Sequence, residues 1–197
     1  MRCHHPDVEV HAQHVAWSDV RAALLEHRVD AVVTRLPFPT HPGRPATDQL
    51  HVTVLHDEPR VVIVPRGHRL AGEDRVTLDD IADEPMPRLL ESDPVWSAYW
   101  RIDPRPDGRP APDGPVIDAL EDKLELVAAG EAVVIGTVAM GDLRPDVTAI
   151  PLEGVEPSHV VLATRADDHS RVVGAFRRYA REHLAGPIPL PVSRDAG

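Results

Sequence analysis

The chain has 197 residues, of which 42% are hydrophobic and 4% aromatic, with a formal net charge of −11 and a sequence pI of about 5.5. The acidic excess argues against a chain that grips phosphate backbones by itself, because such binding relies on Lys and Arg side chains. A single cysteine, Cys3, excludes an internal disulfide, and the lack of a signal-peptide core or of an apolar run of about 20 residues predicts a cytoplasmic protein without a membrane span.

The first predicted elements are a strand, a helix and a second strand. Val8 and Val10 alternate with polar residues, which favours a short half-buried strand. Ser18 is predicted to cap a helix, because its hydroxyl can accept a hydrogen bond from a free amide of the first turn. The apolar face of that helix has i, i+3, i+4 and i+7 spacing: Val20, Ala23, Leu24 and His27. The apolar run 31–33 is typical of a strand buried on both faces in a parallel sheet.

The residues that end this strand form the first candidate ligand site. Thr34 and Arg35 are expected just beyond its carboxyl end, where ligands bind in open α/β sheets. Arg35 could pair bidentately with a ligand carboxylate, or it could be a surface arginine or an interlobe salt bridge, and both interpretations stay open. Trp17 could line the same cleft or pack as a hydrophobic staple.

The middle of the chain is predicted to hold two strands, a short helix and an aromatic cluster. The strands are expected at residues 51–55 and 60–64, and Thr77 is expected to cap a helix over 78–82. Three aromatic residues then share one helical face, for which core packing is the default and a ligand platform the alternative: Trp96, Tyr99 and Trp100.

The last third alternates helices and strands. A helix that starts near Asp118, with Glu121 at capping-box spacing, is predicted to end at Gly130. The predicted strands are residues 133–135, 147–151 and 160–163. Thr137 follows the first of these strands and carries a hydroxyl that could orient a ligand. Ser170 is expected to cap the last helix. This alternation places the fold in the α/β class.

No motif for catalysis or cofactor binding is found in the sequence. It lacks the Walker loop, GxGxxG, HExxH and GxSxG patterns, so no enzyme activity and no cofactor are expected. Four of the twelve histidines cluster near the start, and without carboxylates at ligand spacing they are interpreted as structural or solvated rather than as a metal site: His4, His5, His11 and His14.

Six motifs occur in an order that is typical of one protein family. They are HPDVEV (5–10), LLEHRVDAVVTRLP (24–37), VVIVPRGHRLA (61–71), TLDDI (77–81), LELVAAGEAVVIG (124–136) and LATRADDHSRVVGAFRRYARE (162–182). In this order they resemble the effector-binding, or substrate-binding, domain of LysR-type transcriptional regulators, over nearly all of residues 5–184.

The resemblance implies a type 2 periplasmic-binding-protein-like fold, in which two α/β lobes are joined by two crossing strands and enclose a ligand cleft. It assigns residues 1–185 to the effector-binding domain, and residues 186–197 are expected to form a disordered tail. Lobe one would comprise about 1–58 and 164–185, and lobe two about 60–163.

Carried over position by position, the resemblance assigns ten residues to the ligand cleft. In lobe one these are Trp17, Ser18, Thr34 and Arg35. In lobe two they are Leu90, Asp93, Val95, Glu131, Val133 and Thr137. The sequence departs from the family where Glu131 and Ala132 follow Gly130 in place of a second glycine, and where Thr137 stands near the usual proline.

The resemblance implies an effector-sensing domain that binds a small metabolite, such as an organic acid, and that pairs as a homodimer. The family's winged helix-turn-helix, its linker helix and the first strand–helix unit of lobe one have no counterpart in this sequence, so no direct DNA binding is expected. The alternative is a stand-alone type 2 solute-binding protein, which should carry a signal peptide or lipid anchor. A chain that acts only through dimerisation is a further alternative.

Overall fold

The computed structural model describes residues 8–39, 45, 47–90, 92–119, 122–141 and 144–186. By its internal contacts the chain divides into two units. The first unit comprises Met1–Asp57 and His159–Ile188, and the second comprises Glu58–Ser158 and Pro189–Gly197. Each unit has its own sheet and core.

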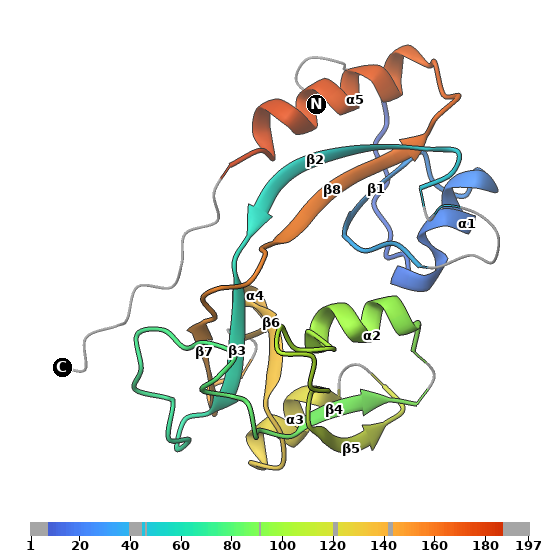
Figure 1. Ribbon diagram of the computed structural model, residues 1–197. Coiled ribbons are helices and arrows are strands. Elements are labelled where there is room, and N and C mark those ends of the chain that lie inside the picture. Colours follow the sequence, from blue (N-terminus) through green and yellow to red (C-terminus); the bar gives the residue numbers. More distant parts are fainter. Residues whose placement is uncertain are drawn as a thin grey trace. The chain divides into compact units, whose positions relative to one another are not determined.

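The first unit is built on a three-stranded sheet with the order β1-β8-β2 (Figure 1). Its elements are η1 (Trp17–Asp19), α1 (Val20–Leu25), β1 (Ala31–Arg35), β2 (Leu50–Glu58), β8 (Ser158–Arg165) and α5 (Arg171–His183). Successive side chains of a strand point to opposite faces of its sheet. Val161 and Ala163 of β8 accordingly pack with α1, whereas Val160 and Leu162 pack with α5. Helices therefore cover both faces of the central strand.

The apolar face of α1 is confirmed, but its predicted start and end are wrong. Val20, Ala23 and Leu24 are fully buried, whereas His27 lies beyond the helix, is exposed and has a positive φ of 58°. Ser18 is not the N-cap, because the 3-10 helix η1 begins one residue earlier and holds Ser18 inside its turn. The N-cap position of α1 is Asp19, which makes no side-chain cap hydrogen bond.

β1 is an edge strand and not the doubly covered parallel strand that was predicted. It pairs antiparallel with β8, from Ala31 opposite Thr164 to Arg35 opposite Val160. One face is covered, so Val32 is buried. The other is covered only in part, because Ala31 packs against the cluster of Leu162 and Ala180 whereas Val33 is 50% exposed. The strand is also longer than predicted. Thr34 and Arg35 are its last residues and not the first residues beyond it.

The second unit has an antiparallel sheet with the order β6-β3-β7 and a parallel pair, β4-β5. Its elements are β3 (Arg60–Pro65), β4 (Met86–Leu89), α2 (Pro94–Arg101), β5 (Asp113–Ile117), α3 (Asp122–Ala128), β6 (Val134–Thr137), α4 (Val138–Gly141) and β7 (Val147–Pro151). Val62 and Val64 of β3 pack in a cluster with Trp100, whereas Val61 and Ile63 pack with Val127 of α3. The predicted buried strand at 60–64 is therefore confirmed.

The aromatic face of α2 packs into the core, as predicted. Trp100 is 8% exposed and meets Trp96 and Tyr99 edge-on, with ring centroids 5.5 and 5.3 Å away. The guanidinium of Arg60 lies 3.7 Å from the centroid of the Tyr99 ring and donates to the Tyr99 carbonyl at 3.0 Å. A cation over an aromatic face adds to the apolar packing that fixes this helix.

The remaining predictions of secondary structure are partly confirmed. No strand forms at Val8–Val10, and residues 78–82 form turns rather than a helix. The Asp80 carboxylate accepts from the amide (2.7 Å) and the hydroxyl (2.8 Å) of Thr77 at the start of these turns. The helix end at Gly130, which has a φ of +76°, and the Ser170 cap of α5 are confirmed. The predicted Glu121 contact and residues 187–197 of the expected tail lie outside the described residues.

Candidate functional site

The four first-lobe candidates lie on two adjoining segments of the first unit. The indole Nε1 of Trp17 donates to the carbonyl of Pro37 at 3.0 Å, which holds η1 against the segment that follows β1. Arg35 is two residues before Pro37, so Trp17 and Arg35 lie at the same end of the sheet. Thr34 and Arg35 are half-buried and Ser18 is exposed. A cation, two hydroxyls and an aromatic ring thus come from one edge of this unit.

Three of the second-lobe candidates lie at the start of α2. Asp93 is the N-cap of this helix, and its Oδ1 accepts from the amides of Val95 (2.9 Å) and Trp96 (3.2 Å). This carboxylate therefore has a structural role, because it satisfies amides that the helix leaves unpaired. Leu90 and Val95 are 67% and 42% exposed beside it.

The other three second-lobe candidates lie around β6. Val133 is 2% exposed inside the core cluster, so only its backbone could touch a ligand. Thr137 is the last residue of β6, is 4% exposed and lies opposite Arg60 of β3. Glu131, in the turn after α3, is exposed. Val133 packs in the same core cluster as Trp100 of α2, and α2 contacts β6.

A pocket that the sequence did not predict lies among β4, α2 and α3 of the second unit. Eight residues line it: Pro87, Leu89, Ser92, Trp96, Ser97, Trp100, Arg101 and Lys123. Its free volume of about 20 Å³ has room for roughly one water-sized group. The hydroxyl of Ser97 donates to that of Ser92 at 2.7 Å. The pocket combines aromatic walls with two hydroxyls and two basic side chains.

Lys123 is the basic residue of this pocket with the most unusual environment. Burial, and next the positive charge of Arg101, lower the pKa of its ammonium from 10.5 to about 8. Within the described part of the chain it makes no hydrogen bond or ion pair. One feature of the sequence sets this residue apart: Lys123 is the only lysine of the chain, and the other 20 residues counted as Lys or Arg are arginines.

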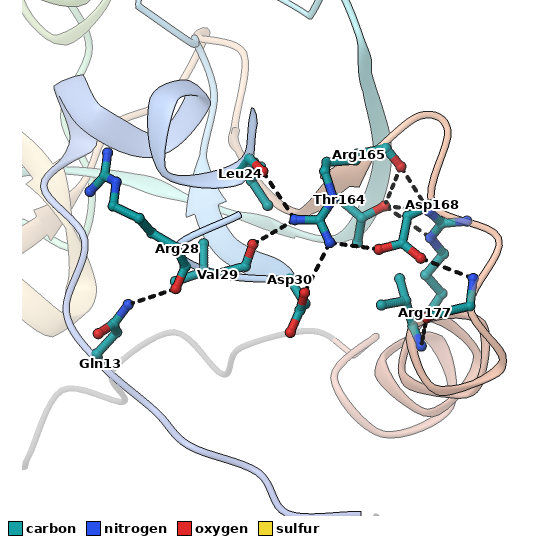
Figure 2. Close-up of polar contacts among 11 residues, drawn as sticks. Gln13, Leu24, Arg28, Val29, Asp30, Thr164, Arg165, Asp168 and Arg177 are labelled. Atoms are coloured by element: carbon teal, nitrogen blue, oxygen red, sulfur yellow. Dashed lines mark hydrogen bonds and ion pairs between the residues drawn. The ribbon is translucent and has the colours of Figure 1, made fainter. Parts of the chain in front are cut away.

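Arg165 is a buried cation of the opposite kind, in the first unit (Figure 2). Its Nη1 donates to the carbonyls of Leu24 (3.0 Å) and Val29 (2.8 Å), and its Nη2 donates to the carboxylates of Asp30 (2.9 Å) and Asp168 (2.7 Å). These contacts tie the end of β8 to the end of α1 and the start of β1. The side chain is 7% exposed, so this cluster is a structural anchor rather than a ligand site.

Neither a metal site nor a membrane span is found in the described residues. No group of three or more His, Cys, Asp or Glu side chains there is close enough to hold a metal ion, and His11 and His14 are exposed. His4 and His5 lie outside the described residues. None of the helices in the described ranges is long and apolar enough to cross a bilayer.

Several solved structures have the same fold, among them a LysR family regulator. The BenM effector binding domain with its effector benzoate has a TM-score of 0.73 and 22% identity, covering 92% of this chain and 81% of that one. The CcmR regulatory domain of Synechocystis PCC6803 in complex with 2-PG has a TM-score of 0.69 and 17% identity, covering 95% and 89%. HinK, a LysR family transcriptional regulator from Pseudomonas aeruginosa, has a TM-score of 0.72 and 21% identity, covering 93% and 63%.

The comparison with curated proteins finds no significant match. Among protein families, the LysR substrate binding domain matches residues 1–185. This match spans nearly the whole chain and agrees with the fold of the solved structures. The two-lobed, periplasmic-binding-protein-like fold expected from the sequence is therefore confirmed, and the chain belongs to the LysR substrate-binding domain family.

Proposed function

We propose that this effector-sensing domain binds a small carboxylate, and that Arg35 holds its charged end with help from Trp17, Ser18 and Thr34. The observation that carries the proposal is the hydrogen bond from Trp17 to Pro37, which brings η1 to the end of β1 where Arg35 lies. A guanidinium matches a carboxylate in geometry and can bind both of its oxygens. An indole beside it supplies an apolar surface for the rest of the ligand.

The relatives support the choice of ligand class. The BenM domain was solved with benzoate, which is a carboxylate, and the family match favours a regulatory domain over a stand-alone solute-binding protein. In such a regulator the ligand would act by favouring one of two domain states, which couples its binding to the rest of the protein. The six second-unit candidates and association with a second copy of the chain remain predictions within this proposal.

The test is a titration of the 197-residue chain with a panel of small carboxylates, starting with benzoate, by isothermal calorimetry. Arg35→Gln removes the positive charge and keeps most of the side chain. The matched control is Arg178→Gln, which removes the charge of an exposed arginine on α5 of the same unit. Thermal unfolding with each compound gives a second readout, because a ligand selective for the folded state raises the melting temperature.

We expect Arg35→Gln to weaken the best carboxylate about tenfold or more, since hydrogen bonds to charged groups contribute about 1.5–3 kcal/mol. Arg178→Gln should bind like the parent chain, and the neutral amide benzamide should not bind. Equal affinity of the parent chain and Arg35→Gln for the same carboxylate would remove Arg35 from the site.

A further inference from the structure

We propose that Tyr99 is a positioning residue that ties α2 to both chain connections between the two units, so that a change at the start of α2 reaches both of them. The chain enters the second unit at Glu58 and leaves it after Ser158. Tyr99 would thus give the domain a route from a bound effector to these connections. The route rests on the proposed sensing function and does not depend on Arg35.

The first connection is held to α2 through Arg60, which lies just after Glu58. The Nη1 of Arg60 donates to the carbonyl of Tyr99 at 3.0 Å, and its guanidinium carbon lies 3.7 Å from the centroid of the Tyr99 ring. This carbonyl belongs to the last turn of α2, where the helix dipole attracts a cation. Arg60 is 5% exposed, so both contacts are made away from water, where such interactions are stronger.

The return connection is held to α2 by the same tyrosine. The hydroxyl of Tyr99 donates to the carbonyl of Pro157 at 3.3 Å, immediately before β8 begins. Residues 153–157 belong to no strand, so no sheet ladder fixes this carbonyl. The next residue, Ser158, is fully buried, and its hydroxyl has no hydrogen-bond partner in the described residues. Tyr99 therefore supplies a hydrogen bond that the serine of the connection does not.

The opposite end of α2 carries predicted ligand residues. Asp93 caps the helix, and Val95 is exposed beside it. Ring contacts run along the helix from there, because Trp96 and Tyr99 both meet Trp100 edge-on, with centroids 5.5 and 5.3 Å away. Packed side chains on a helix can carry a displacement from one end to the other. A shift of the capped end is therefore expected to reach the residue that holds both connections.

Hydrogen exchange of the full chain, followed by mass spectrometry, tests the two ties without a ligand. Tyr99→Phe removes the bond to Pro157 and keeps the ring beside Arg60, whereas Arg60→Met removes the cation at the first connection. The matched control is Tyr179→Phe on α5 of the first unit, since the chain has only these two tyrosines. Because no ligand is added, a failure of the Arg35 assignment would leave this result unchanged.

We expect Tyr99→Phe to speed amide exchange at residues 155–159 about two- to tenfold, which is the effect of losing one hydrogen bond. Exchange at residues 58–62 and in α5 should stay at the parent rate. Tyr179→Phe should leave both connections unchanged. A parent-like rate at 155–159 in Tyr99→Phe would overturn the tie to the return connection.

A change at the start of α2 tests whether the ties transmit it. Asp93→Ala removes the cap and should speed exchange at the helix start and, by about threefold, at 58–62 and 155–159 as well. Added to Tyr99→Phe, it should no longer speed exchange at 155–159, and added to Arg60→Met, it should no longer do so at 58–62. General destabilisation would instead add equally in every background. An Asp93→Ala effect confined to α2, or one that is the same at 155–159 with and without Tyr99→Phe, would overturn the proposal.

Discussion

Each unit contains a cation that is at least half-buried, and the two cations are in opposite situations. Arg165 of the first unit is 7% exposed and donates to four acceptors, two carbonyls and two carboxylates. Lys123 of the second unit is half-buried and has no partner in the part of the chain that the structure describes. A buried cation is tolerated when its hydrogen bonds are made and is unfavourable when they are not. The first arrangement holds the fold together, and the second contributes no such contacts.

The pKa values express the same contrast. Burial alone would lower the pKa of Arg165, but hydrogen bonds to Asp30 and Asp168 outweigh it and raise the pKa. At Lys123 burial and the charge of Arg101 act in the same direction, and the pKa falls to about 8. Folding therefore favours the charged form of Arg165 and disfavours the charged form of Lys123.

The largest expected effect is that of Arg165→Met. This change removes four hydrogen bonds and leaves the carboxylate of Asp168, which is 9% exposed, without its buried cation. We expect the free energy of unfolding to fall by about 3–5 kcal/mol, the usual loss when one partner of a buried pair is removed. Urea denaturation measures it, with Arg28→Met, an exposed arginine paired with Asp19, as the nearly neutral control. A loss under about 1 kcal/mol would contradict the anchoring role of Arg165.

A smaller effect is expected from Thr164→Val, next to Arg165 on β8. The fully buried Thr164 hydroxyl accepts from Nε (2.9 Å) and Nη2 (2.6 Å) of Arg177 on α5. Losing this acceptor should cost about 1–2 kcal/mol in the same assay. The control is Thr53→Val on β2, because the buried Thr53 hydroxyl has no partner in the described residues. If Thr53→Val destabilised the chain as much as Thr164→Val, the loss would not come from the Arg177 contact.

The smallest expected effect, and the one with the opposite sign, is that of Lys123→Met. Removing a half-buried charge that has no partner in the described residues should raise the free energy of unfolding at pH 7 by about 1 kcal/mol. The folded pKa of about 8 lies below the ordinary 10.5, so the unfolded chain binds more protons between these values and the parent chain gains stability as pH rises through them. The difference between variant and parent should therefore shrink from pH 7 to pH 9.5, as followed by thermal unfolding. A variant less stable than its parent at pH 7 would mean that the Lys123 ammonium is already paired.

Local patterns in the sequence predicted the parts of the fold that depend on neighbouring residues. The apolar run of β3, the Ser170 cap and the glycine end of α3 need no knowledge of distant segments. The exposed face of β1 could not be predicted in this way, because it depends on which strand pairs with it and how many helices cover that pair. The displaced start of α1 depends on the contact between Trp17 and Pro37, two residues far apart in sequence.

In the candidate site, too, some residues could be assigned from the sequence and others could not. Its first-unit residues could be assigned by resemblance, since the LLEHRVDAVVTRLP motif places Thr34 and Arg35 in order. The capping role of Asp93 was missed, although an aspartate before a proline at the start of a helix is a familiar signal. Lys123 was missed because its flanking sequence, Asp122 and Leu124, is that of an ordinary exposed helix. Its burial comes from residues of β4 and α2, which lie far from Lys123 in the sequence.

The order of strands in the first unit has a consequence for how the chain is made. β8 is the central strand of that sheet, yet it follows every strand of the second unit in the sequence. On the ribosome, β1 and β2 emerge early and have no strand between them until β8 is synthesised. The strands of the second unit all lie within Glu58–Ser158, so its sheet can assemble before β8 is available to β1 and β2. β1 and β2 are thus translated well before the strand that pairs with both of them, and the nascent chain exposes their strand edges throughout that interval.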